Sequence, residues 1–299
     1  MSSRKSIITL GTFDGVHLGH QKMIAELLAQ AKKLDYEPIL LTFFPHPTHI
    51  LTPDKPLKMI NSIDERVELL KKKGIQNVIV QEFTQSFANK SAYDFITDKL
   101  IGELAMKKLL VGYDHRFGKN KEGDFESLSR YAKELEFDME RLPALDVNGV
   151  TVSSSLIRQL LIDGKIEQVN ALLGYHFCLF GSVVKGNQLG RKIGFNTANI
   201  VLDYPNKIVP KVGVYAVQSF IDGKHYYGMM NIGYRPTVQG THRTIEVHYF
   251  NLNKDLYDKK IRVYVLKRLR DELKFANITA LKEQLEKDKT NVLNYIKSL

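Results

Sequence analysis

The sequence predicts an α/β domain with a parallel sheet, followed by an antiparallel β-barrel domain that ends in a helix. Residues 5–174 alternate between short apolar strands and amphipathic helices, which is the pattern of βαβ units. After Gly174, short strands follow one another without helices between them, as in an antiparallel barrel. We therefore expect a first domain over residues 1–174 and a second over residues 175–299.

The expected elements of the first domain follow from the spacing of its apolar residues. Ser62 and Glu65 have the spacing of a capping box and open a helix that ends near Gly74. Ligands of such sheets bind beyond the carboxyl ends of the strands. The remaining expected elements are strands at 7–10, 39–44, 78–80 and 109–111 and helices at 21–34 and 91–101.

The second domain is expected to be a series of strands rich in β-branched and aromatic residues. Asp222-Gly223 is the turn of a hairpin between two of them. The strands are expected at residues 183–184, 214–220, 225–230, 244–250 and 261–266. Thr279 is expected to cap the final helix, whose apolar stripe is Leu281, Leu285, Val292 and Ile296.

Composition places the chain among ordinary globular proteins, with 43% hydrophobic and 25% charged residues. No apolar run approaches the length of a membrane span, and the N-terminus is too polar for a signal peptide. The lone Cys178 predicts a buried thiol and a reducing cytoplasm. The net charge of +10 suits either a nucleic acid or small polyphosphates as partners.

The strongest local signal is the turn at residues 11–20, Gly-Thr-Phe-Asp-Gly-Val-His-Leu-Gly-His, between the first strand and the first helix. Its glycines permit close backbone approach, and the helix start offers N–H groups and a positive dipole end to a phosphate. His17 and His20 share one face of that helix start and can donate hydrogen bonds to one ligand. The alternative is a pair of surface histidines, but the neighbouring strand and helix favour a phosphate site.

This stretch resembles the His-x-Gly-His signature of the nucleotidyltransferase superfamily. Its longer form resembles the FAD synthetase module of the prokaryotic bifunctional riboflavin kinase/FAD synthetase (FMN adenylyltransferase) family. Three further segments match in order: Phe-Pro-His-Pro at 44–47, Val-Gly-Tyr-Asp-His-Arg-Phe-Gly at 111–118 and Val-Ser-Ser-Ser-Leu-Ile-Arg at 152–158. The resemblance implies a Rossmann-like nucleotidyltransferase domain that transfers AMP from ATP to FMN, giving FAD and pyrophosphate.

The resemblance also implies roles for individual residues. The FMN phosphate would attack the α-phosphorus of ATP in line, with no protein nucleophile. His17, His20, Arg158 and Mg²⁺ would stabilise the developing charge. The implied nucleotide-binding residues are Gly11, Thr12, Phe13, Asp14, Gly19, Ser153, Ser154 and Ser155, and the implied flavin-binding residues are Phe44, His46, Asp114 and Phe117.

In the second domain, residues 186–199 resemble the riboflavin kinase signature that binds ATP and Mg²⁺. Thr197 and Asn199 are two residues apart, so on an extended segment their oxygens project to the same side, as a Mg²⁺ site requires. Glu246 matches the general base that takes a proton from the riboflavin hydroxyl. The resemblance further implies nucleotide-binding Gly186, Gly190, Arg191 and Gly194, and flavin-binding Arg270.

Asn196 departs from the signature, which has proline before the threonine. Proline fixes its own φ, so its loss is expected to loosen the metal-binding loop. The chemical groups Thr197, Asn199 and Glu246 all remain, so the first hypothesis is a bifunctional enzyme of FMN and FAD biosynthesis that acts on ATP, riboflavin and FMN. The alternative is a monofunctional FAD synthetase whose inactive barrel only binds flavin.

Two other classes of protein fit the sequence less well. A nucleic-acid-binding barrel would present aromatic residues such as Tyr226, Tyr227 and Tyr249 among basic residues, but would leave the phosphate-type loops unexplained. A tRNA synthetase fragment would need a Lys-Met-Ser-Lys-Ser loop, which the sequence lacks. We expect small-molecule substrates and neither nucleic acid nor membrane as partners, with FAD-requiring apoproteins as recipients of the product.

Overall fold

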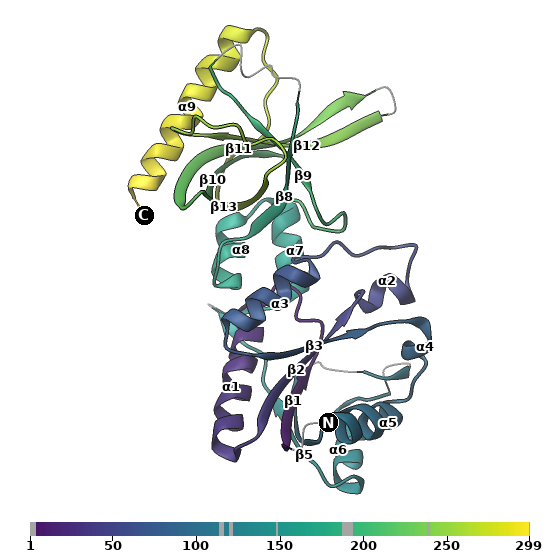
Figure 1. Ribbon diagram of the computed structural model, residues 1–299. Helices are drawn as coiled ribbons and strands as arrows, with labels where there is room; N and C mark the ends of the chain where they lie inside the picture. The colour runs from purple at the N-terminus through teal and green to yellow at the C-terminus, as the bar shows by residue number, and fades with distance from the viewer. Residues whose placement is uncertain are drawn as a thin grey trace. The chain divides into compact units, whose positions relative to one another are not determined.

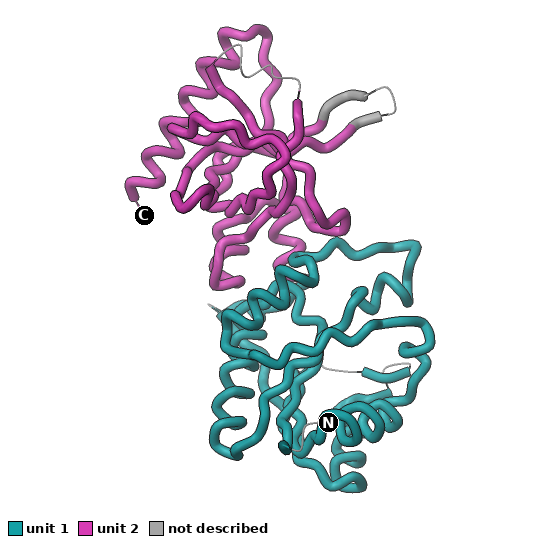
Figure 2. Tube along the Cα trace, in the orientation of Figure 1, with its two compact units in different colours: residues 1–154 teal, residues 155–299 magenta. Residues whose placement is uncertain are grey.

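A computed structural model describes residues 4–113, 117–119, 122–147, 149–186, 194–237 and 240–298. The chain divides into two compact units, residues 1–154 and residues 155–299 (Figure 2). This division comes before the boundary expected near residue 174, because helices α7 (Ser154–Asp163) and α8 (Ile166–Leu173) are grouped with the barrel. The Asn170 side chain of α8 donates to the Val265 carbonyl at 2.9 Å and accepts from the Phe177 N–H at 2.8 Å, which ties α8 to the barrel.

The first unit is built on a parallel sheet, as expected. In the described residues its strand order is β3-β2-β1-β4-β5, with every neighbouring pair parallel (Figure 1). The strands are β1 (Ser6–Leu10), β2 (Glu37–Phe44), β3 (Asn77–Glu82), β4 (Met106–Gly112) and β5 (Asp138–Leu142). Sequence reasoning missed β5, an edge strand whose acidic and basic residues hide the strand pattern.

Helices cover both faces of this sheet because successive strand residues point to opposite sides. On one face Ile7 of β1 packs in a cluster with α1 (Leu18–Leu34) and α3 (Ile63–Lys72). On the other face Ile8 packs in a cluster with the π-helical segment Phe95–Glu103 and α6 (Phe125–Glu134). The short elements of this unit are α2 (Pro47–Leu51), α4 (Gln85–Ala88), α5 (Ala92–Asp94), β6 (Asp146–Val147) and β7 (Val150–Thr151).

The second unit contains a closed antiparallel barrel, which confirms the predicted fold class. Among the described residues the strand order around the barrel is β10-β11-β12-β9-β8-β13. Asp222 and Gly223, with φ of 47° and 80°, form the predicted hairpin turn. The strands are β8 (Cys178–Val184), β9 (Ala198–Leu202), β10 (Gly213–Ile221), β11 (Lys224–Thr237), β12 (Gly240–Tyr249) and β13 (Lys260–Arg270).

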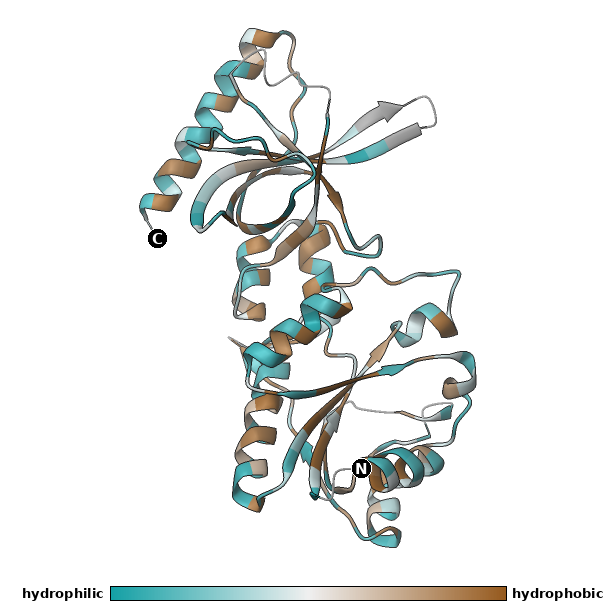
Figure 3. Ribbon diagram, in the orientation of Figure 1, coloured by the Kyte–Doolittle hydropathy of each residue, from teal (hydrophilic) through white to brown (hydrophobic). Residues whose placement is uncertain are grey.

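The C-terminal helix α9 (Ile278–Lys297) packs on the barrel through Val292, which belongs to a hydrophobic cluster with Val214 and Phe250. Figure 3 shows hydrophobic and hydrophilic residues alternating along α9, as expected for a helix with one buried face. The predicted cap was wrong. Asn277, not Thr279, caps the helix, because the Asn277 Oδ1 accepts the Ala280 N–H at 2.9 Å.

Candidate active sites

The turn between β1 and α1 is shaped by His17, which caps the helix. Its Nδ1 accepts the His20 N–H at 3.4 Å, so α1 begins at Leu18, earlier than the spacing of apolar residues indicated. Phe13, Gly15 and Val16 all have positive φ, at 48°, 84° and 37°. For the β-branched Val16 such a conformation is costly, and strained backbone of this kind clusters at ligand sites.

The two histidines lie together at the start of α1. Their rings are stacked with centroids 3.6 Å apart and planes 17° from parallel. A Cβ added to Gly19 would lie 3.2 Å from the His17 ring, so glycine there leaves room for this stack. Among the described residues, the buried Nδ1 of His20 has no hydrogen-bond partner. Such an atom is poised to bond to a ligand.

The electrostatic surroundings keep His20 neutral. Burial lowers the pKa of His20 well below its ordinary value of 6.5, and the nearby His17 and Arg66 lower it further. A neutral imidazole offers one donor and one acceptor. His20 can therefore donate one hydrogen bond to a phosphate oxygen without first taking up a proton.

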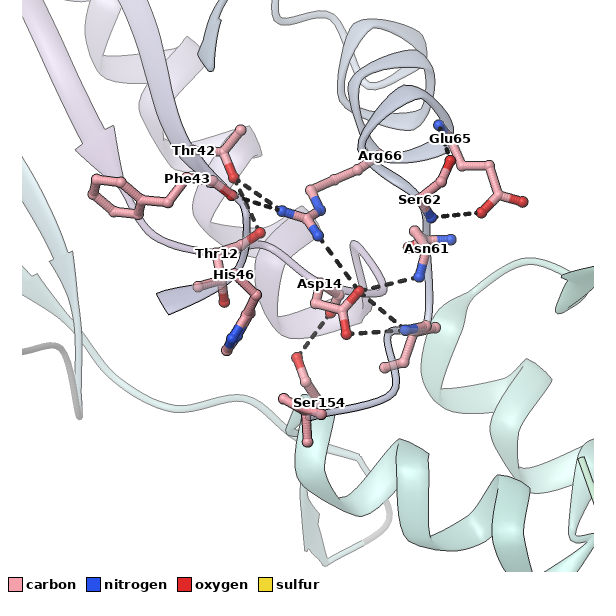
Figure 4. A network of polar contacts seen from close by, with 12 residues as sticks. Thr12, Asp14, Thr42, Phe43, His46, Asn61, Ser62, Glu65, Arg66 and Ser154 are labelled. Carbon is pink, nitrogen blue, oxygen red and sulfur yellow. Dashed lines mark hydrogen bonds and ion pairs between the residues drawn. The ribbon is translucent and has the colours of Figure 1, made fainter. Parts of the chain in front are cut away.

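Beneath the turn, a buried carboxylate holds the backbone in place (Figure 4). The Asp14 carboxylate accepts the N–H of Ile60 at 3.0 Å and that of Asn61 at 3.1 Å. The Asp14 backbone carbonyl accepts the Ser154 hydroxyl at 2.8 Å. The Asp14 side chain is completely buried, so these hydrogen bonds anchor the turn to the rest of the unit.

Arg66 of α3, which sequence reasoning missed, completes this network. Its Nη2 lies 3.8 Å from Asp14 Oδ1, and its Nη1 donates to Thr42 Oγ1 and to the Phe43 carbonyl, both at 3.4 Å. The Thr42 hydroxyl in turn donates to the Thr12 carbonyl at 3.1 Å. Arg66 thus joins α3 and the end of β2 to the turn that carries the histidines (Figure 4).

The other predicted residues of this site have varied surroundings. Phe13 is buried, with its ring 5.0 Å from that of His20, and Gly11 lies against the Phe13 ring. His46 caps α2 by accepting the Thr48 N–H at 3.2 Å, while Phe44 is partly exposed. The Phe117 ring packs edge-on against Phe95, 5.7 Å away.

The predicted nucleotide-binding serines and the predicted catalytic Arg158 are divided between the units. Ser153 is half-buried and precedes α7, which begins at Ser154. Ser155 is exposed and Arg158 half-buried, and both lie on α7 in the second unit. Asp114 is outside the described residues.

The barrel has a cleft of about 610 Å³ lined by the ends of β9 and β12 and by residues 251–257. Gly186, Gly194, Thr197 and Asn199 all line it, so the structure brings these predicted residues together. Thr197 Oγ1 donates to Glu246 Oε2 at 3.4 Å, and Asn199 pairs with Glu246 in the β9–β12 ladder. Gly190 and Arg191 are outside the described residues.

The donor set of this cleft suits a hard cation. Thr197 offers a hydroxyl and Asn199 an amide oxygen, and both are oxygen ligands of the kind that Mg²⁺ accepts. A Cβ added to Gly186 would lie 2.1 Å from Asn199 Nδ2, so this glycine forms a cradle for the Asn199 side chain. Among the described residues, no group of three or more His, Cys, Asp or Glu side chains could hold a metal ion.

Arg270, predicted to bind flavin, is engaged elsewhere in the structure. Its Nε and Nη2 donate to the Asp288 carboxylate of α9 at 2.9 and 2.6 Å, and its Nη1 donates to the Asp271 carbonyl at 2.9 Å. Asp288 is only 1% exposed and also accepts from Gln284. This arrangement fastens α9 to the end of β13.

A parallel sheet with a histidine pair at a helix start, joined in one chain to a barrel with an oxygen-lined cleft, defines a two-part nucleotide-dependent transferase. Residues 1–156 match the family model of FAD synthetase, and residues 173–296 match that of riboflavin kinase. The chain belongs to the bifunctional riboflavin kinase/FMN adenylyltransferase family.

Curated relatives extend over almost the whole chain. The bifunctional riboflavin kinase/FMN adenylyltransferase of Escherichia coli K12 is 37% identical over 283 residues, which cover 94% of this chain and 90% of the relative. The protein of the same name from Bacillus subtilis 168 is 38% identical over 303 residues, covering 99% and 94%.

A solved structure described as a macrolide-efflux protein from Streptococcus pneumoniae is also similar. It matches with a TM-score of 0.90 at 32% identity, covering 98% of this chain and 95% of that one. Within the described residues of the present chain, no helix has both the length and the apolar character needed to cross a membrane.

Proposed function

We propose that this chain makes FAD in two ATP-dependent steps, phosphorylating riboflavin to FMN and then transferring AMP from ATP to FMN. The observation that carries the proposal is the stacked His17–His20 pair at the start of α1, in a chain whose halves match FAD synthetase and riboflavin kinase models in tandem. We assign the adenylyl transfer to residues 1–174 and the phosphorylation to residues 175–299.

For adenylyl transfer, the N–H groups at the start of α1 and the imidazole of His20 receive the phosphates of ATP. The FMN phosphate attacks the α-phosphorus in line, and pyrophosphate leaves. His17 positions the backbone that carries His20, and the Asp14–Arg66 network holds the turn beneath it. We assign Ser153–Ser155 and Arg158 to the pyrophosphate, because hydroxyls and a guanidinium bind such groups well.

For the kinase step, Glu246 takes the proton of the riboflavin hydroxyl while the hydroxyl oxygen attacks the γ-phosphorus of ATP, and ADP leaves. Thr197 and Asn199 would hold Mg²⁺, which neutralises phosphate charge when bound. The Thr197 hydroxyl donates to Glu246, and this bond helps to orient the carboxylate. We also propose that FAD-requiring apoproteins take up the product in a reducing cytoplasm.

The test is to give the purified chain riboflavin, ATP and Mg²⁺ and to separate the flavins by chromatography over time. We expect FMN to form first and FAD to follow, with both products abolished by excess EDTA. A chain that converts added FMN to FAD but forms no FMN from riboflavin would refute the kinase half. The monofunctional alternative would then hold.

A further inference from the structure

The backbone of the turn before β9 is bonded to the side chain of His248 on β12. His248 Nδ1 lies 2.8 Å from the Asn196 carbonyl oxygen, and because a carbonyl can only accept, Nδ1–H is the donor. Burial lowers the pKa of His248, which leaves the ring neutral. Phe195, next to Asn196, is buried and its ring lies 5.0 Å from that of His248.

This bond lies directly beside the oxygen atoms that line the barrel cleft. Thr197 follows Asn196, and Thr197 Oγ1 donates to Glu246, two residues before His248 on the same strand. Alternate residues of a strand share one face. Glu246 and His248 therefore hold the turn at two successive residues, one through a side chain and one through the backbone.

The local sequence gives this turn little stiffness of its own. Gly194, at φ 85°, is exposed with nothing near its missing Cβ, and Asn196 is exposed and lacks the fixed φ of a proline. Ordering one flexible residue costs conformational entropy, and the free-energy cost is comparable with the contribution of one hydrogen bond to stability. The bond from His248 on β12 thus provides the constraint that a proline would provide at position 196.

We propose that His248 is a positioning residue of the kinase site. Its Nδ1–H holds the Asn196 carbonyl so that Thr197 and Asn199 keep the spacing needed to bind a magnesium–nucleotide complex. This inference rests on the proposed riboflavin kinase function. His248 lines the cleft together with Asn196, and it acts on the kinase site through the bond of its ring to the backbone of the turn.

The experiment compares two substitutions in the full-length chain. His248→Phe keeps an aromatic ring against Phe195 and removes the donor, whereas His248→Asn restores a donor at a similar distance from the backbone. Binding of Mg·ADP is measured by calorimetry and by the rise in melting temperature, and FMN formation by KM for Mg·ATP and by kcat. FAD formation from added FMN serves as the internal control for folding of the other unit.

We expect His248→Phe to weaken Mg·ADP binding and raise KM for Mg·ATP about tenfold with a smaller effect on kcat, and His248→Asn to stay within about twofold of the parent chain. Adding Asn196→Pro to His248→Phe should recover most of the loss. Equal binding by His248→Phe and the parent chain, or equal loss in both His248 variants, would overturn the inference. If His248→Phe fails to fold, His248→Leu, which also lacks the donor, takes its place: weaker Mg·ADP binding than by His248→Asn supports the inference, and equal binding overturns it.

Failure of the kinase proposal itself can be distinguished from failure of this inference. A parent chain that forms no FMN but binds Mg·ADP refutes only the kinase activity, and the binding comparison still decides the role of His248. A parent chain that does not bind Mg·ADP at all refutes both.

Discussion

Replacing Arg66 by methionine tests whether the buried charge pair beneath the histidine turn holds unit 1 together. Arg66 is 2% exposed and Asp14 is fully buried, so the substitution leaves a carboxylate without its counter-charge in the interior. Breaking a buried pair in this way costs about 3–5 kcal/mol. The N–H groups of Ile60 and Asn61 still bond to Asp14, which places the expected loss at about 3 kcal/mol.

For a unit of this size, a loss of about 3 kcal/mol lowers the melting temperature by roughly 6–12 °C. The assay is a heat pulse at increasing temperature, followed by measurement of the remaining FAD formation from FMN at 25 °C. FMN formation from riboflavin, measured on the same samples, reports on the barrel and should keep its parent profile. The paired variant Asp14→Asn/Arg66→Met removes both charges and should recover at least half of the lost stability.

Two results would contradict this prediction: Arg66→Met losing FAD formation at the same temperature as the parent chain, or the paired variant being less stable than Arg66→Met alone. Either result would mean that the two side chains do not form one electrostatic unit. The turn would then be held by Thr42 and the backbone of β2, and not by the pair of charges.

Three further predictions concern the sites and their titration. His20→Ala should lower FAD formation at least about a hundredfold and spare FMN formation, and Glu246→Ala should do the reverse; equal losses of both activities in a folded variant would contradict the two-site assignment. Because the pKa of His20 is lowered from 6.5 in the folded chain, its contribution to stability is complete above pH 6.5 and is lost as the pH falls below it. His20→Gln should therefore reduce the acid slope of the unfolding free energy by up to about 1.4 kcal/mol per pH unit as the pH falls below 6.5, measured by urea titration, and an unchanged slope would show that another group titrates there. Gly186→Ala puts a Cβ 2.1 Å from the Asn199 amide, so it should raise KM for Mg·ATP in FMN formation at least tenfold, about 1.4 kcal/mol, without changing FAD formation; an unaltered KM would show that Asn199 does not hold the nucleotide.

Local chemistry explains how far the sequence alone predicted the structure. The Ser62–Glu65 capping box, the Asp222-Gly223 turn and the parallel-then-antiparallel order are set by neighbouring residues, and the structure has all three. The final helix was capped at the wrong residue because Asn277 and Thr279 are both good caps, and only the tertiary path of the chain selects between them.

The candidate sites were predictable where the signal lay in one short segment and not where it came from distant residues. His17 and His20 were singled out from the turn itself, and their stacking fits that expectation. Arg66 reads as an ordinary charged residue of an amphipathic helix, since nothing near it in sequence reveals a partner as distant as Asp14. The bond from His248 to Asn196 likewise joins a strand residue to a turn residue far from it in the sequence, and the two meet only in the folded barrel.

The position of β1 in its sheet determines when the first unit can fold during synthesis. β1 pairs with β2 on one side and β4 on the other, and β5 then pairs with β4. The strand made first thus keeps an open edge until Met106–Gly112 has left the ribosome. Because such distant pairings form slowly, the sheet beneath the histidine turn is completed on this side only after about ninety further residues have followed His20.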